Sequence, residues 1–372
     1  MGKRHLAVIA PGYLRNQQNF RGVELCVSNL AEALSERGIR VDLIRMRGSS
    51  AQVESIGDNL CLYHFNSSNK RDGLKKLKHY VDEHHPDVLL AARGHRDNLI
   101  AAALKKDKQY RKLPVMLSMH NSDYVCLPWY KRMGLIWRMR TDYARADKII
   151  TVSRGLSTAV QQFSGLAADH FTTIYNPIVS DRLYAKADAG VDHAWLTDTV
   201  PLILSIGQLS AQKDFATLLR AFALVRRHQT ARLMILGEGE DRMKLQSLAQ
   251  ELGIADDVLL YGFDPNPFRF LKHADLFVLS SAWEGLPTVL IEAMAVGTPL
   301  VSTDCPNGPR EILDNGKYGE LVAVGNSEAL AQAMQKVMGR PPPAELLSIG
   351  ADRFTITRIA DEYMAALGLS VE

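Results

Sequence analysis

The sequence predicts two α/β domains, each built on a parallel sheet covered by helices. Its 372 residues exceed one ordinary core and suit two domains of about 150 to 200 residues each. Short apolar runs alternate with stretches of helical spacing along most of the chain, which is typical of parallel strands joined by crossover helices. The pattern loosens over residues 178–200, and we expect the two domains to join there.

In the first domain, the apolar run 6–10 ends at Pro11 and Gly12, and a helical pattern over 22–37 leads to a strand over 39–44. Further strands are expected at 87–92, 114–120 and 148–153, and helices at 71–84, 97–109, 129–146 and 154–164. This alternation predicts a Rossmann-like first domain over residues 1–177.

A second series of the same kind follows. Strands are expected at 201–206, 231–236, 258–261, 276–280 and 299–302, and helices at 214–228, 242–252, 267–273 and 288–296. Short strands with helical crossovers predict another Rossmann-like sheet, in a domain over residues 178–352. Ligands of such sheets bind beyond the carboxyl ends of the strands, so with two domains the expected site is the cleft between them.

The composition is that of a soluble globular protein, with 47% hydrophobic and 23% charged residues, which excludes disordered and fibrous classes. No apolar run reaches the roughly 18 residues of a membrane span, and the N-terminal apolar stretch is too short for a signal peptide. We therefore expect a cytoplasmic protein. Its four cysteines are scattered without C-x-x-C spacing, which argues against a disulfide framework and against a zinc site.

The net charge of +3 hides an asymmetry between the two halves. Residues 1–177 hold 27 Lys/Arg and 16 Asp/Glu, a balance of +11, and residues 178–372 hold the remaining 17 and 25, a balance of −8. A basic half is typical of contact with an anionic partner, such as a membrane, a phosphorylated acceptor or a nucleic acid. A merely solvated surface is the alternative. Since no recognition motif for nucleic acid is present, we expect no nucleic-acid partner.

The stretch with the most candidate functional residues begins where a strand ends near Ser280. A loop carries Glu284, and a helix opens at Pro287 or Thr288 with Glu292 one turn inside. Amides at the start of a helix, together with its dipole, favour an anion such as a diphosphate; the expected donors are Gly285, Leu286 and Thr288. The two carboxylates suit hydroxyl groups on either side, Glu292 a ribose and Glu284 a transferred sugar. Alternatively, both are surface acids that stabilise a helix start.

This motif, two glutamates separated by seven residues within EGLPTVLIEAMAVGTPLV, resembles the signature of family 4 retaining glycosyltransferases of the GT-B fold. The resemblance implies two Rossmann-like domains facing a central cleft, with Glu284 on the donor sugar and Glu292 on the ribose. It also implies retention of anomeric configuration by attack on the face that the diphosphate leaves. Residues 353–372 resemble the family's final helix, which crosses back to the first domain.

Lys213 is the predicted leaving-group residue. It lies in the loop after the strand 201–206, behind Gly207, whose missing side chain allows a ligand close to the backbone. A fixed ammonium stabilises the charge that builds up on the departing diphosphate. The family has Arg directly after this glycine, whereas this chain has Gln208, which carries no charge. In place of that arginine, either Lys213 alone stabilises the charge of the diphosphate or another cation, such as Arg310, contributes. A plain helix-flanking lysine is the alternative.

Other candidates come from strand ends. Gly237 and Gly262 follow two further strands and fit a nucleobase pocket, although singly each is typical of a tight turn. In the first domain, Gly12 and Gly22 flank a polar loop that is expected to bring amides close to the donor diphosphate. Gly22 opens a helix where the family often has Gly-Gly, and His120 matches a family histidine that contacts the donor sugar. Arg93 and His95 also follow a strand and are possible cleft residues, but neither matches a known residue of the family.

The segment 130–140 mixes cations with aromatic and aliphatic side chains at helical spacing. This pattern suits an anionic membrane surface. The alternative is a helix that packs Leu135, Ile136 and Met139 inward and leaves its Lys and Arg in solvent. Combined with the basic half, the pattern favours peripheral association with the inner face of the cytoplasmic membrane.

Together with the basic first half, the resemblance implies transfer of a hexose or N-acetylhexosamine from a UDP-sugar to a saccharide, either a lipid-linked oligosaccharide or a lipopolysaccharide core. No Asp-x-Asp occurs, so we expect no metal and no cofactor besides the nucleotide-sugar substrate. The alternatives are a GDP-sugar-dependent transferase, a nucleotide-sugar epimerase, a phosphorylase, and a non-catalytic nucleotide-binding regulatory module.

Overall fold

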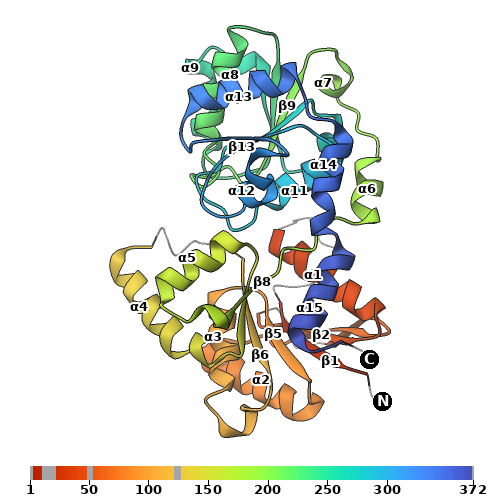
Figure 1. Ribbon diagram of the computed structural model, residues 1–372, viewed down its shortest axis with the longest axis vertical. Helices are drawn as coiled ribbons and strands as arrows, with labels where there is room; N and C mark the ends of the chain where they lie inside the picture. The colour runs from red at the N-terminus through yellow and green to blue at the C-terminus, as the bar shows by residue number, and fades with distance from the viewer. Residues whose placement is uncertain (1–2, 11–21, 48–52, 121–126, 371–372) are drawn as a thin grey trace. The chain divides into compact units, whose positions relative to one another are not determined.

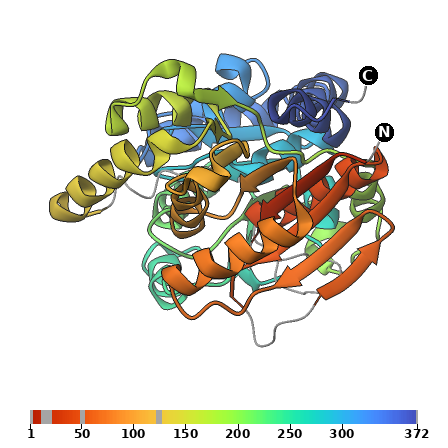
Figure 2. The ribbon, with the colours of Figure 1, turned by 90° about the horizontal axis from the view of Figure 1, so that it is seen from below.

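The computed structural model describes residues 3–10, 22–47, 53–120 and 127–370. The chain divides into two compact units, the first formed by Met1–Pro177 with Ile356–Glu372 and the second by Ile178–Thr355. Each unit is a sheet flanked by helices (Figures 1 and 2). The last segment of the chain thus belongs to the same unit as the first.

The described part of the first unit contains an eight-stranded sheet of order β3-β4-β2-β1-β5-β6-β7-β8. Neighbouring strands are parallel except β3, which is antiparallel to β4. β1 and β5 are buried along their whole length, because helices cover both faces of such a sheet. The strands are β1 (His5–Ile9), β2 (Arg40–Arg45), β3 (Val53–Gly57), β4 (Leu60–His64), β5 (Val88–Ala91), β6 (Val115–Met119), β7 (Lys148–Thr151) and β8 (Phe171–Thr173).

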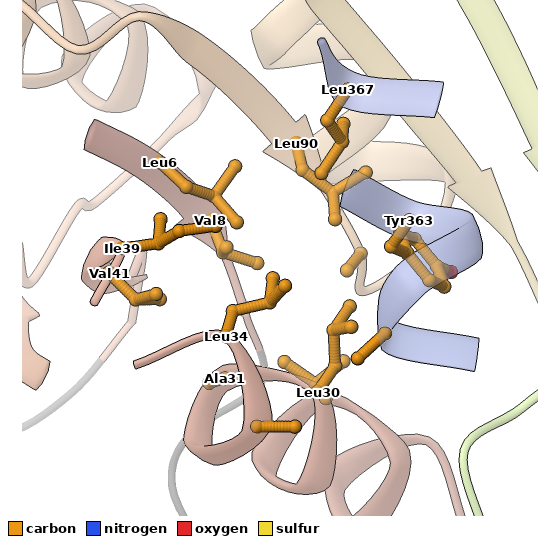
Figure 3. Close-up of a cluster of buried hydrophobic side chains, with 14 of the residues drawn as sticks. Leu6, Val8, Leu30, Ala31, Leu34, Ile39, Val41, Leu90, Tyr363 and Leu367 are labelled. Carbon is orange, nitrogen blue, oxygen red and sulfur yellow. The ribbon is translucent and has the colours of Figure 1, made fainter. Parts of the chain in front are cut away.

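The main α-helices of this unit are α1 (Gly22–Glu36), α2 (Lys70–His84), α3 (His95–Leu104), α4 (Trp129–Thr141), α5 (Arg154–Ser164) and α15 (Ile356–Leu367). α15 packs beside α1 over the sheet, although the two are far apart in sequence. Figure 3 shows Leu30 and Leu34 of α1, Tyr363 and Leu367 of α15 and Leu90 of β5 as members of one buried cluster. Each buried leucine contributes roughly 2 kcal/mol through the hydrophobic effect. This shared core fixes the C-terminal helix to the first unit.

The second unit contains a six-stranded sheet of order β11-β10-β9-β12-β13-β14 among the residues described, with all neighbours parallel. The chain builds the sheet outward from β9 through β10 to β11, then returns to the other side of β9 with β12 and continues outward. The strands are β9 (Leu202–Ile206), β10 (Arg232–Leu236), β11 (Val258–Gly262), β12 (Leu276–Leu279), β13 (Leu300–Thr303) and β14 (Glu320–Val322).

Helices cover this second sheet, and α8 and α13 pack against each other on it. The helices are α6 (Asp181–Ala187), α7 (Ala194–Thr197), α8 (Phe215–Arg226), α9 (Arg242–Glu251), α10 (Phe268–His273), α11 (Thr288–Ala295), α12 (Pro309–Ile312), α13 (Ser327–Gly339) and α14 (Ala344–Ala351).

The prediction of two parallel-sheet α/β domains is confirmed, with corrections in detail. The segment 178–200, where the two domains were expected to join and no helix was expected, contains α6 and α7. The helix expected over 129–146 ends at Thr141 and gives way to a 3₁₀ turn over Tyr143–Arg145. The antiparallel edge strand β3 was not expected, and it makes the first sheet mixed rather than wholly parallel.

Candidate active site

The candidate site lies at the topological switch point of the second sheet. β9 and β12 are neighbours there, and their continuations run to opposite edges of the sheet. Such a switch opens a crevice beyond the carboxyl ends of the two strands, where ligands of open α/β sheets bind. The loop after β9 carries Gly207 and Lys213, and the loop after β12 carries Glu284.

These two loops are tied to each other by hydrogen bonds. The Gln212 carbonyl accepts from Ala282 N at 2.8 Å, and the Gln212 side-chain amide donates to the Trp283 carbonyl at 3.0 Å. The Ser280 hydroxyl donates to the carbonyl of Lys213 at 2.7 Å. The acidic loop therefore has its position set by the loop after β9.

Glu284 is buried and ion-paired. Its Oε1 lies 2.5 Å from Lys213 Nζ and accepts a second hydrogen bond from the Ser281 hydroxyl at 2.7 Å. Only 6% of the residue is exposed, so the attraction is screened less than in a surface pair. The structure thus brings together the predicted sugar-binding acid and the predicted leaving-group cation.

Gly207 gives Lys213 its place. A Cβ on Gly207 would lie 3.1 to 3.2 Å from three carbons of the Lys213 side chain. The aliphatic part of the lysine therefore crosses the backbone where a side chain would otherwise stand. Gln208, the next residue, is exposed, and Arg310, the possible substitute cation, is ion-paired with Asp304. Of the two candidate cations, Lys213 and Arg310, only Lys213 is ion-paired with one of the predicted site glutamates.

The first turn of α11 has no side-chain cap. The preceding residues Gly285, Leu286 and Pro287 are buried, and the helix begins at Thr288 as expected. Gly308, at φ +94°, packs on this loop, where a Cβ would come within 2.5 Å of Pro287 Cδ. A neighbouring glycine therefore fixes the backbone that precedes the helix, while its role in holding a diphosphate stays a prediction.

Glu292 lies one turn inside α11 and is only 5% exposed. Burial raises its pKa to about 7, against the opposing effects of a hydrogen bond from Thr288 and the charge of Lys186. Glu292 therefore keeps its proton to a higher pH than an ordinary glutamate does. It lies in the same helix whose start follows Glu284, so both predicted acids flank one helix terminus.

Lys186 of α6 was not among the predicted site residues. Its Nζ lies 5.7 Å from the Phe268 ring centroid, and its charge favours the ionised form of Glu292. Burial lowers the pKa of Lys186, and the charge of Arg182 lowers it further. The only sequence signal was Ser180, which caps α6 and would have placed a helix inside the expected linker.

Three glycines stack at the ends of adjacent strands. Gly207 N donates to the Leu236 carbonyl at 2.9 Å, and Gly237 N donates to the Gly262 carbonyl at 2.8 Å. Gly237 and Gly262 have positive φ values of 142° and 98°. Close backbone approach explains these glycines in the structure, and their part in a nucleobase pocket stays a prediction.

We expect Gly237→Ala to destabilise the second unit by at least about 3 kcal/mol, because overpacking and backbone strain act together. The new Cβ would stand 1.9 Å from the Gly207 carbonyl oxygen, in a backbone region that side chains rarely adopt. Gly253→Ala is the matched control, since Gly253 also has positive φ but has open space around it. Urea denaturation followed by circular dichroism measures both. Equal losses in the two variants would contradict the steric argument.

The remaining predicted residues lie in the first unit. Gly22 is the first residue of α1, and Gly12 lies outside the described residues. His120 follows β6, and its Nε2 is 3.1 Å from the Ser118 hydroxyl. Burial lowers the pKa of His120 to about 4, against the opposing effect of a hydrogen bond to Asn176, so its ring is neutral at physiological pH. The contact of Gly22 and His120 with the donor stays a prediction.

His95 and Arg93 have local partners. His95 Nδ1 lies 2.7 Å from the Tyr143 hydroxyl, and burial lowers the pKa of His95 to about 4, helped by the charge of Arg138. Arg93 lies 3.9 Å from the buried carboxylate of Asp97. These contacts account for both residues without a ligand.

Solved structures with the same two-domain fold match the chain over nearly its whole length. Sucrose-phosphate synthase from Thermosynechococcus elongatus has a TM-score of 0.81 at 19% identity, covering 99% of this chain and 100% of that one. HepE from Anabaena in complex with UDP-glucose has a TM-score of 0.74 at 17% identity, with coverage of 99% and 100%. The lipopolysaccharide outer core galactosyltransferase WaaB has a TM-score of 0.73 at 20% identity, with coverage of 99% of both chains. At these identities the likeness shows the fold, which is the predicted GT-B fold.

Similar sequences are glycosyltransferases. An uncharacterized glycosyltransferase of Methanocaldococcus jannaschii is 48% identical over 113 residues, 30% of this chain and 28% of the relative. The N-acetylgalactosamine-N,N'-diacetylbacillosaminyl-diphospho-undecaprenol 4-alpha-N-acetylgalactosaminyltransferase of Campylobacter jejuni is 35% identical over 53% of this chain and 52% of that protein. The lipopolysaccharide core biosynthesis glycosyltransferase LpsE of Rhizobium meliloti is 29% identical over 85% of both chains. The chain thus spans about a quarter of the length of the first of these relatives and about half of the length of the second.

Two family profiles match the chain one after the other. The profile described as "Glycosyltransferase Family 4" matches residues 20–182, and the one described as "Glycosyl transferases group 1" matches residues 194–351. Between them they include His120, Lys213, Glu284 and Glu292. The chain belongs to the group 1, family 4 glycosyltransferases of the GT-B fold, which are of the retaining class.

Proposed function

We propose that the enzyme transfers a hexose or N-acetylhexosamine from a UDP-sugar to a saccharide acceptor, a lipid-linked oligosaccharide or a lipopolysaccharide core. The observation that carries the proposal is the Lys213–Glu284 pair, fixed at the switch point beside the uncapped start of α11. The crystallised complexes of HepE with UDP and UDP-glucose support the donor. The names of the Campylobacter and Rhizobium relatives support the acceptor class.

In the proposed donor complex, Glu292 accepts hydrogen bonds from the ribose hydroxyls and the first amides of α11 bind the diphosphate. Glu284 accepts from a hydroxyl of the transferred sugar. His120, neutral at physiological pH, acts as a hydrogen-bond partner of that sugar. Lys213, held against Glu284, lies next to the departing phosphate oxygen.

The reaction exchanges one bond at the anomeric carbon for another. The bond from this carbon to the phosphate oxygen breaks, and a bond to the acceptor hydroxyl oxygen forms on the same face, which gives retention. The acceptor proton passes to the leaving phosphate oxygen. The Lys213 ammonium stabilises the charge that develops on the diphosphate, without giving up a proton. With this cation in place, we propose that turnover needs no metal.

The test incubates the protein with panels of UDP-sugars and GDP-sugars plus saccharide acceptors, and measures the nucleoside diphosphate released. We expect release from UDP-sugars, insensitive to EDTA, and an axial or equatorial linkage that matches the donor by NMR. Glu284→Gln should lower turnover roughly 10²-fold, because a buried group that orients the reacting sugar is altered. Glu328→Gln, an exposed acid of the same unit, is the control.

Each other outcome contradicts a defined part of the proposal. Preference for GDP-sugars would overturn the donor assignment, and an inverted linkage would overturn retention. Conversion of the nucleotide sugar without release of the diphosphate would identify an epimerase. Nucleotide binding without any turnover across the panels would identify a regulatory module.

A further inference from the structure

Helix α4 exposes an apolar stripe. Its members are Trp129, Met133 and Trp137, exposed by 77%, 58% and 66%, and the adjacent Tyr130, exposed by 56%. Four of the nine exposed large apolar side chains in the described part of the chain thus lie on this one helix. Clusters of this kind are uncommon on monomeric proteins and mark interaction sites.

The stripe is not the face that packs on the first unit. Trp129, Met133 and Trp137 are each four residues apart, so they follow one another along one side of the helix. Met139 is buried and Leu135 and Ile136 are half-buried, so the inward face predicted for these residues exists as well. α4 contacts α5, and Figure 2 shows it projecting from the body of its unit. The aromatic side is therefore a second face of α4, and it does not pack against the rest of the unit.

The charges of α4 all have one sign. The helix carries Lys131, Arg132, Arg138 and Arg140 and no acidic residue. Arg132 lies over the Phe163 ring at 5.7 Å, and Arg140 donates to the Ser164 carbonyl at 2.7 Å, so both turn toward α5. All four remain exposed. An anionic surface complements this helix in both respects, since it attracts the cations while Trp and Tyr favour the interface between water and lipid.

We propose that α4 docks the protein on an anionic lipid bilayer, with Trp129, Met133 and Trp137 entering the interface and Lys131 and Arg138 contacting the head groups. Within the described residues, no helix is long and apolar enough to cross a membrane. An amphipathic helix lies in the plane of the bilayer interface with its apolar face buried. Its affinity for the bilayer rises with the apolar area buried and with the negative charge of the lipid. The proposal rests on the proposed function only for its biological reason, which is a lipid-linked or lipopolysaccharide acceptor.

The experiment is vesicle flotation without donor or acceptor, so its result is separate from catalysis. Wild-type protein is mixed with vesicles of phosphatidylcholine alone or containing phosphatidylglycerol, at low and high salt. We expect binding to the anionic vesicles, weakened by salt. Trp129→Ser/Met133→Ser/Trp137→Ser should weaken it by at least about tenfold. Lys131→Gln/Arg138→Gln should weaken it and reduce its dependence on salt.

Met243→Ser/Ile349→Ser is the matched control, because these side chains are 72% and 64% exposed in the second unit. It should bind as the wild type does, and all variants should melt at similar temperatures because none changes the core. Absence of wild-type binding to anionic vesicles overturns the proposal, and so does unchanged binding of the triple variant. Concentration-dependent self-association that the triple variant abolishes, without vesicle binding, would instead identify α4 as an interface between copies of the chain.

Discussion

Lys213→Met is expected to lower kcat by roughly 10² to 10³ with a smaller change in KM for the donor. The ammonium acts mainly on charge that develops as the diphosphate departs, so its loss affects the transition state more than the bound substrate. The same substitution should lower the free energy of unfolding by roughly 3 kcal/mol. It leaves the Glu284 carboxylate buried without its ion-pair partner, which lies 2.5 Å away in the structure.

The two effects can be separated with a second variant. Lys213→Met/Glu284→Gln removes the unpaired charge and should recover most of the stability, while activity stays low. Lys244→Met is the control, because Lys244 pairs with Asp241 at an exposed site, where an ion pair is worth under about 1 kcal/mol. Steady-state kinetics and urea denaturation measure these differences. Recovery of activity along with stability in the double variant would show that Lys213 serves only to neutralise Glu284.

The sequence was sufficient for much of the fold because the central strands are buried on both faces. Runs such as Leu202–Ile206 contain almost only apolar residues, and a turn or a helix follows each of them. The edge strands lack that signal. β3 is largely exposed and β14 is half-buried, so neither stands out from loop sequence. The helix α6 is absent from the prediction because the Asp and Ala residues around it interrupt the apolar periodicity of a helix.

The part of the site whose residues are close in sequence could be predicted. Glu284 and Glu292 share one short motif, and their spacing around a helix start is local in sequence. The pairing of Lys213 with Glu284 spans 71 residues, and it arises because β9 and β12 are neighbours at the switch point, which strand order along the chain does not reveal. Lys186 was missed because it lies in α6, a helix that the sequence pattern did not predict. A long-range contact between charges needs the sheet order before it can be inferred.

Glu292 should make the stability of the protein depend on pH between about 4.5 and about 7. The first value is the ordinary pKa of a glutamate, and burial raises the folded-state pKa to about 7. The folded state thus holds the proton more tightly than the unfolded chain. The stabilisation by the neutral acid is fully present below pH 4.5 and is lost as the pH rises through 7. A shift of this size corresponds to roughly 3 kcal/mol.

Glu292→Gln removes this dependence, because the amide is neutral at every pH and nearly the same shape. The difference in free energy of unfolding between the Gln variant and the wild type should therefore shift by roughly 3 kcal/mol in favour of Gln from pH 4 to pH 8. Urea denaturation across this range measures it, with Glu328→Gln as the exposed control. Because ribose hydroxyls donate to the ionised carboxylate, UDP binding to the wild type should strengthen as the pH rises through 7, and the Gln variant should lose that trend. A constant stability difference would contradict the raised pKa, whereas equal UDP binding by both proteins at pH 8 would place the ribose elsewhere.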